Sequence, residues 1–266
     1  GHWLYTESVD ERLDELKATK LEDAKRCYTD LVGASGAQFV AVGDFDPEAL
    51  SGLVEELFGG WKNPSPYTRI PARYFERDPL QQVVATPDKA NAVLRAAVNL
   101  PLRDDHRDFP ALIFGNYLIG GTSSARLPAR VREKEGLSYS TYSYLSAGAL
   151  DAAGVFGLSS IYAPQNRDRV ERAIQEELER ALAEGFSDAE VAAAKKGFLE
   201  ARALARAQDR GLASRLSNYL FVGRTFAWDT EFEKRIAALG PAEVRDALRR
   251  HIDPKKLSVM KAGDFR

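Results

Sequence analysis

The chain has 266 residues, enough for one large domain or two smaller ones. Its 44% hydrophobic and 29% charged residues are typical of a globular protein, and 37 basic residues are balanced by 39 acidic ones. The resulting net charge of −2 removes the usual reason to expect nucleic acid or an anionic membrane as a partner.

No stretch approaches the roughly 18 consecutive apolar residues of a spanning helix, and we expect no signal peptide at the start of this sequence. The composition leaves the compartment open between bacterial cytoplasm and periplasm. The single cysteine, Cys27, lies in a helical pattern and cannot form an internal disulfide. We therefore expect it to be a small buried hydrophobic side chain.

The first sixty residues alternate helices with one strand. Apolar residues recur at helical spacing over 20–31 and again over 47–61, where Pro47 suits a first helical turn. Between these helices, the run QFVAVGDF at 38–45 predicts a short buried strand. A stretch with four prolines follows at 62–79, which predicts an interdomain linker, placed at 62–75.

The rest of the chain predicts a sheet followed by a helix-rich tail. Strands are expected at QQVVATP and AVLRAAVNLPL, and STYSYLSAG and GVFGLSSIYA alternate like paired antiparallel strands. Helices are expected at 108–121 and in the run SARLPARVREKEG. Residues 167–250 are expected to be almost wholly helical, with Asn166 and Ser187 as helix caps, and KLSVMKAGDF closes as a strand. The fold class is therefore α+β, with helices on one face of a mostly antiparallel sheet.

One internal repeat bears on domain organisation. Residues 21–45 and 241–265 align without a gap, at an offset of 220 residues, and both end in Gly-Asp-Phe. Both predict a helix, a break and a buried strand. We therefore expect residues 1–61 to end one domain and residues 76–266 to form a complete second domain of the same kind.

The segment from Asn116 to Ser140 has the residues of a capped helix followed by a tight turn into a strand. Ser123 or Ser124 is a suitable N-cap for the helix that follows, and Gly136 suits the left-handed position after it. Pro128 would fall early in that helix, so the helix is expected to start late or to be irregular. Seven residues separate Arg132 from Tyr139 across the helix-to-strand turn, so both can point into one cleft.

This segment, with its Ser-Ser-x-Arg-Leu, Arg-Glu and Gly-Leu-Ser-Tyr elements, closely resembles the C-terminal module of the insulinase/pitrilysin family of zinc peptidases. The resemblance covers nearly all of residues 20–266 and implies an insulinase/mitochondrial-processing-peptidase-like fold. It also implies that Arg132 and Tyr139 contact substrate near the zinc and help to bind the tetrahedral intermediate. From the residues alone, Arg132 could instead pair with Glu133 or Glu135, and Tyr139 could be a core aromatic side chain.

The zinc-binding part of the resembling family is missing from this sequence. That family holds zinc with His-x-x-Glu-His and a later glutamate, whereas none of the three histidines here (His2, His106 and His251) begins that motif. We expect His106, in the polar run RDDHRD, to be a solvated loop residue. The chain alone is therefore predicted to bind no metal and to be inactive, with zinc held elsewhere in the parent protein or by a partner subunit.

The favoured function is the C-terminal part of a zinc-dependent endopeptidase. Its expected partners are a peptide or unfolded polypeptide substrate and a zinc-binding N-terminal half or partner subunit, and a homodimer is possible. An alternative is a non-catalytic scaffold or peptide-holding subunit beside an active zinc peptidase. A third alternative is a general peptide-binding module, for which replacing Arg132 would leave an associated peptidase unaffected.

Overall fold

The computed structural model describes residues 5–265 and divides the chain into two compact units, Gly1–Ile70 and Pro71–Arg266. The boundary falls within the expected linker. No helix in the described part of the chain is long and apolar enough to cross a bilayer.

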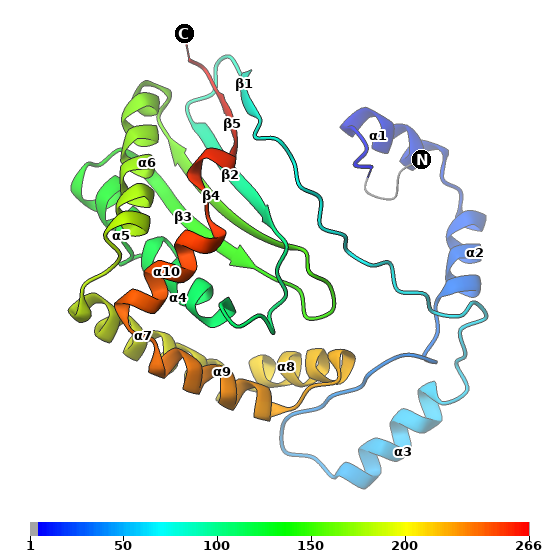
Figure 1. Ribbon diagram of the computed structural model, residues 1–266. Coiled ribbons are helices and arrows are strands. Elements are labelled where there is room, and N and C mark those ends of the chain that lie inside the picture. The colour runs from blue at the N-terminus through cyan, green and yellow to red at the C-terminus, as the bar shows by residue number, and fades with distance from the viewer. Residues whose placement is uncertain (1–4, 266) are drawn as a thin grey trace. The chain divides into compact units, whose positions relative to one another are not determined.

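The described part of the first unit has three helices and no strand (Figure 1). They are α1 (Val9–Ala18), α2 (Leu21–Leu31) and α3 (Pro47–Phe58). Asp46 caps α3 by accepting from the backbone N–H groups of Glu48 and Ala49. None of the three helices has a buried residue among those described.

Two predictions for this unit are wrong. Residues 38–45 do not form a strand, and Cys27 is exposed. The physical reason for the first is that a strand needs neighbours for its backbone N–H and C=O groups, and the first unit offers no other strand in its described residues. Helix α2 has no buried residue among those described, and Cys27 on it faces solvent.

The second unit is built on a five-stranded sheet in the order β1-β5-β2-β4-β3 (Figure 1). The strands are β1 (Gln81–Ala85), β2 (Ala92–Leu100), β3 (Ser138–Ser146), β4 (Gly154–Tyr162) and β5 (Ser258–Gly263). Only β1 and β5 pair in parallel, while the pairs β5–β2, β2–β4 and β4–β3 are antiparallel. The predicted hairpin of β3 and β4 is confirmed.

The helices of this unit cover the sheet and form a long helical tail. They are α4 (Phe109–Ile119), α5 (Arg126–Pro128), α6 (Arg167–Ala183), α7 (Asp188–Arg206), α8 (Asp209–Val222), α9 (Phe226–Ala238) and α10 (Pro241–His251), with a π-helical turn at Ala129–Lys134 and 3-10 turns at Pro164–Asn166 and Pro254–Lys256. The expected helix-rich tail is confirmed. Ser187 caps α7 through a reciprocal bond with Glu190, as predicted.

The core lies between the sheet and helices α4, α6 and α10. Helix α4 is apolar almost all round, because it is buried between β3 on one side and α7 and α10 on the other. Gly115 lets α10 approach closely, since a Cβ there would lie 2.9 Å from the side chain of Leu248. Fully buried Phe114 and Phe156 each contribute roughly 1.5–3 kcal/mol of hydrophobic stabilisation.

Candidate functional site

The loop between α4 and α5 begins with a glycine that close packing requires. Gly120 is the C-cap of α4, and a Cβ on that residue would lie 2.6 Å from the backbone nitrogen of Ser143 in β3. The same Ser143 N–H donates to the carbonyl of Gly120 at 3.1 Å. The end of α4 is therefore held directly against β3.

The helix after this loop starts one residue later than a Ser124 cap would place it, in line with the late start expected from Pro128. Its N-cap is Ala125, which makes no side-chain cap, and Ser124 instead shares a hydroxyl contact with Thr122 at 3.3 Å. The prediction of Ser123 or Ser124 as N-cap is wrong. Because Pro128 is then only the third helical residue, its missing N–H is one that has no partner within the helix in any case.

Arg132 lies in a π-helical turn, not in a regular α-helix. The turn spans Ala129–Lys134, and the Glu135 N–H donates to the Arg130 carbonyl at 3.0 Å. The expected irregularity is confirmed, and such turns are common at functional sites. Gly136 takes the predicted left-handed conformation, with φ of 62°, and the Leu137 N–H donates back to the Val131 carbonyl at 2.9 Å.

Tyr139 lies at a second backbone irregularity, which the sequence did not predict. Ser138 pairs with Tyr162 and Ser140 with Ile161, so Tyr139 is the extra residue of a β-bulge in β3. Bulges turn a side chain away from the regular alternation of a strand and recur beside active sites. The side chain of Tyr139 is 74% exposed, so it is not a core aromatic side chain.

A buried cluster of hydroxyls holds this bulge in place. Ser138 Oγ donates to the carbonyl of Ile161 at 2.8 Å and accepts from the Ser140 N–H at 3.1 Å. Thr141 Oγ1 lies 2.9 Å from Ser138 Oγ and 2.8 Å from Ser160 Oγ. The only sequence signal for this cluster was the serine- and threonine-rich composition of the two strands, which does not give their register.

Three arginines in this segment have very different surroundings. Arg126 makes two hydrogen bonds to Glu190, at 2.8 and 3.0 Å, and Arg130 contacts three carboxylates, those of Glu135, Glu176 and Glu177. Arg132 differs, because its side chain is 57% exposed and its nearest carboxylate, on Glu133, lies 3.5 Å away. Arg130 binds Glu135, so among the described residues Arg132 has the exposed ion pair with Glu133, one of the two pairings that its sequence allowed.

A hollow of about 270 Å³ lies beside Arg132. Its lining comes from the loop after α4, the π-helical turn and β3: Gly120, Gly121, Thr122, Ser123, Pro128, Arg132, Ser140, Thr141 and Tyr142. Tyr139 is not part of this lining, so the structure brings Arg132 next to Tyr142 and leaves Tyr139 at the surface outside the hollow. Arg132 is the one side chain of formal charge in the lining.

The sequence of this chain matches a known protein family. Residues 19–198 match the family described as the Peptidase M16 inactive domain. The chain belongs to this family.

Solved structures agree with the fold of an M16 inactive domain. One, described as a peptidase M16 inactive domain from Pseudomonas fluorescens, has a TM-score of 0.71 at 20% identity and covers 84% of this chain and 52% of that one. A protease from Helicobacter pylori has a TM-score of 0.75 at 17% identity, over 94% of this chain and 60% of that one.

A curated relative is named an uncharacterized zinc protease, from Streptomyces coelicolor. It is 34% identical over 136 residues, which are 50% of this chain and 29% of the relative. The chain therefore spans less than a third of the length of this curated relative, and 52% and 60% of the two solved chains above. The predicted relation to zinc proteases is confirmed at the level of the family.

Two of the histidines in this M16 domain lie with an acid in a group that could in principle hold a metal. The donor atoms of His106, Asp108 and His251 lie within 4.8 Å of one another. His106 lies in the expected loop, but it is half-buried, with its ring centroid 5.2 Å from that of His251 in an edge-to-face contact, so it is less solvated than predicted. His2 lies outside the described residues.

The bonding of this group does not fit zinc. Both oxygens of Asp108 accept from Arg250 at 2.9 Å, and one also lies 2.9 Å from His251 Nε2. Nδ1 of His106 accepts the backbone N–H of Asp108 at 3.1 Å. A cation would have to displace a guanidinium and compete with that N–H. The hydrogen bonds from Arg250, helped by His251, lower the pKa of Asp108 to about 2 and make the group a structural ion pair between α10 and α4.

Proposed function

We propose that this chain is the carboxyl-side part of a zinc-dependent endopeptidase that supplies Arg132 and Tyr139 to the substrate but no zinc ligand. The zinc would be held by an N-terminal half of the parent protein or by a partner subunit. The substrate class would be peptides or unfolded polypeptides, whose backbone carbonyl groups are the acceptors that a guanidinium and a phenol can bind. Family membership and the names of the relatives support the class of enzyme.

The observation that carries the proposal is the contrast among the three arginines. Arg126 and Arg130 each make charged hydrogen bonds to carboxylates of other elements, so they act in the fold. Arg132, two residues after Arg130, has only an exposed ion pair with Glu133 and lines a hollow together with several hydroxyl groups. An exposed ion pair of this kind adds little stability, so the guanidinium can exchange it for a carbonyl or carboxylate of a substrate.

Tyr139 supports the same proposal through its backbone setting. Three buried hydroxyls hold the bulge that exposes Tyr139. The phenol of Tyr139 makes no hydrogen bond within the described structure, so it is available to a ligand. Such rigid support is what a residue needs if its hydroxyl must meet a substrate oxygen at one fixed position. Removing one donor to a developing oxyanion typically reduces turnover about 10²–10³-fold.

The proposed organisation of the parent follows the internal repeat. Residues 1–61 would end a preceding domain, 62–75 would link it to the next, and 76–266 would form a complete M16 domain. The exposed Tyr139, Tyr142 and Tyr144 of β3 would then face the zinc-bearing part or, in a homodimer, a second copy.

The experiment that tests this proposal uses the full-length parent protein, cleared of loosely bound metal. About one tightly bound zinc per chain together with peptide hydrolysis is expected. Arg132→Ala and Tyr139→Phe should each reduce turnover by about 10²-fold with zinc content unchanged. Arg169→Ala serves as a control, because Arg169 is similarly exposed, at 62%, and lies on α6 away from the hollow.

Two outcomes would count against it. Absence of zinc from the parent would favour the alternative of a peptide-holding subunit beside an active partner. Zinc and full activity in both variants would exclude the roles of Arg132 and Tyr139 and favour a simple peptide-binding module.

A further inference from the structure

The side chains that line the hollow beside Arg132 are rich in hydrogen-bond donors and include no carboxylate. Arg132 supplies the one formal charge, which is positive. The hydroxyl groups of Ser123, Ser140 and Tyr142 line the same hollow and make no hydrogen bond within the described part of the chain. A ligand in this hollow therefore meets an unbalanced positive charge together with free O–H donors.

The backbone of the loop after α4 adds to these donors. The carbonyl of Gly120 accepts the Ser143 N–H at 3.1 Å, and the carbonyl of Thr122 accepts the Ala125 N–H at 3.2 Å. The N–H groups of Thr122 and Ser123, in contrast, have no acceptor among the described residues. Since these carbonyls are occupied and the N–H groups are free, the loop favours a ligand that accepts hydrogen bonds, and above all an anion.

The loop is also anchored, so its donors need little rearrangement to receive a ligand. A Cβ on Gly121 would lie 2.8 Å from the Cα of Tyr117, so glycine is needed for the loop to lie against α4. The N–H of Gly121 donates to the carbonyl of Asn116 at 2.9 Å. Donors that are already in place lose less free energy on binding than donors that must first be ordered.

The present contact of Arg132 indicates which anion suits it. Arg132 Nε lies 3.5 Å from a carboxylate oxygen of Glu133, and both side chains are more than half exposed. Glu133 is not part of the lining of the hollow. An exposed pair of this kind is worth about 1 kcal/mol at most. Because a guanidinium has five N–H donors, Arg132 can meet a second carboxylate that enters through the hollow.

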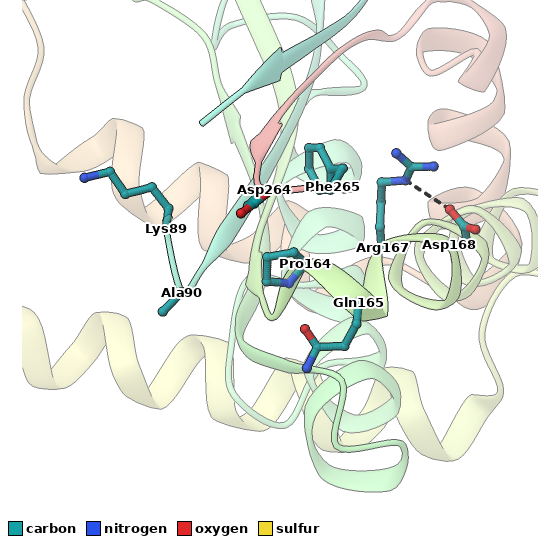
Figure 2. Close-up of a pocket in the computed structure, with 8 residues that line it drawn as sticks. All are labelled: Lys89, Ala90, Pro164, Gln165, Arg167, Asp168, Asp264 and Phe265. Carbon is teal, nitrogen blue, oxygen red and sulfur yellow. Dashed lines mark hydrogen bonds and ion pairs between the residues drawn. The ribbon is translucent and has the colours of Figure 1, made fainter. Parts of the chain in front are cut away.

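A larger hollow in the same unit, of about 500 Å³, lacks this imbalance of charge (Figure 2). Its lining contains two cations, Lys89 and Arg167, and two acids, Asp168 and Asp264. Arg167 Nε donates to Asp168 at 3.0 Å, and its guanidinium lies 5.1 Å from the centre of the Phe265 ring. The formal charges of that lining cancel, so charge favours the hollow beside Arg132 as a site for an anion.

We propose that the hollow beside Arg132 is a subsite for a carboxylate of the polypeptide substrate, carried by an aspartate or glutamate side chain or by the C-terminus. Arg132 supplies the charge, and Thr122, Ser123 and Tyr142 supply further donors. This inference rests on the proposed function for the identity of the ligand as a peptidase substrate. It adds Ser123 and Tyr142, as specificity-determining residues, to Arg132 and Tyr139.

Binding of short peptides to the 266-residue chain tests the subsite directly. The probes are acetyl-Ala-Glu-Ala-amide, its neutral counterpart acetyl-Ala-Gln-Ala-amide, and acetyl-Ala-Gln-Ala with a free C-terminal carboxylate. Titrations follow the amide NMR signals of Gly121, Thr122 and Ser123. At least one peptide with a carboxylate should bind about 10-fold or more tightly than the neutral one, and which of the two does so identifies the source of the carboxylate. Equal affinity for all three peptides would overturn the proposal.

Two neighbouring serines provide a matched pair of variants. Ser123 and Ser124 are both exposed, but only Ser123 lines the hollow. Ser123→Asp places a carboxylate among the donors and should abolish the preference for a peptide carboxylate, as Arg132→Gln should. Ser124→Asp adds the same charge one residue further on and should preserve most of the preference. Loss of the preference in both serine variants would assign it to the general charge of the surface and overturn the proposal, as would its retention in both.

These titrations require neither zinc nor turnover, so their outcome is separate from that of the proposed function. A parent protein without zinc, combined with a clear carboxylate preference in the 266-residue chain, would contradict the proposed function and support the subsite. A parent that hydrolyses peptides, combined with equal affinities in the titrations, would contradict the subsite alone. Where both hold, the parent should cleave the preferred peptide with kcat/KM about 10-fold above that of its neutral counterpart.

Discussion

Thr141 Oγ1 lies 2.9 Å from Ser138 Oγ, across the bulge that carries Tyr139. Both side chains are buried, and Ser160 closes the cluster from the neighbouring strand, at 3.1 Å from Ser138 and 2.8 Å from Thr141. The exposed tyrosine thus depends on three hydroxyls that never reach the surface. This arrangement separates the residue that would touch a substrate from the residues that position it.

Ser138→Ala tests that dependence. The substitution removes the acceptor of the Ser140 N–H and the contact of Thr141, so the free energy of unfolding should fall by about 1–3 kcal/mol. Guanidinium unfolding of the chain measures the change. Ser146→Ala, on an exposed side chain at the end of the same strand, should stay within about 0.5 kcal/mol. In an active parent enzyme, a positioning role further requires that Ser138→Ala lower kcat more than it alters KM.

Arg130 and Arg132 should separate stability from function. Arg130→Ala removes the cation shared by Glu135, Glu176 and the almost wholly buried Glu177, and should destabilise the chain by roughly 2–3 kcal/mol. Arg132→Ala should change the free energy of unfolding by less than about 0.5 kcal/mol, because only an exposed ion pair with Glu133 is lost. Equal losses for both variants would show that Arg132 is a structural residue.

The ion pair of Asp108 predicts how the free energy of unfolding falls at acid pH, which is the acid limb of the stability profile. Its pKa is lowered from 3.8 to about 2 in the folded chain, first by the hydrogen bonds from Arg250 and then by His251. Between about pH 4 and pH 2 the unfolded chain therefore binds more protons, so this contribution is complete above pH 4 and is lost as the pH falls towards 2. About 2 kcal/mol is involved, since one pKa unit corresponds to about 1.4 kcal/mol.

Asp108→Asn should remove this contribution at neutral pH and flatten the acid limb, as measured by chemical unfolding from pH 2 to pH 7. Asp246→Asn is the matched control, because Asp246 is half exposed and its hydrogen bonds within the described structure come from its neighbour Arg245. An acid limb unchanged by Asp108→Asn would assign acid sensitivity to other carboxylates, such as that of Glu190, whose pKa Arg126 also lowers to about 2.

Local signals in the sequence predicted much of the second unit. The Ser187 cap, the left-handed Gly136 and the β3–β4 hairpin all rest on contacts between residues near one another in the chain. The strand expected at 38–45 failed for the opposite reason. Its pairing partners are not local, and a sequence pattern gives the tendency of a segment without showing whether its neighbours are present.

The candidate site shows the same limit, because contacts between residues distant in the chain are not visible in local sequence patterns. The sequence singled out Arg132 and Tyr139, but could not say that Arg126 and Arg130 would be held by distant carboxylates while Arg132 would pair only with its neighbour Glu133. Apart from Glu135, the carboxylate partners of Arg126 and Arg130 come from α6 and α7, about 45 to 65 residues away in the chain. The bulge at Tyr139 likewise depends on register with β4, so it was not visible in the alternation of β3.

Gly120→Ala tests whether close packing of α4 on β3 shapes the hollow beside Arg132. An added Cβ would lie 2.6 Å from the backbone nitrogen of Ser143, and backbone cannot rotate away as a flexible side chain can. The end of α4 must shift, so the free energy of unfolding should fall by about 1–3 kcal/mol. Gly148→Ala is the control, because the nearest atom to its Cβ would be a carbonyl oxygen of Asp151 at 3.4 Å. In the active parent, Gly120→Ala should also raise KM, since Gly120 lines the hollow, whereas Gly148→Ala should leave KM unchanged.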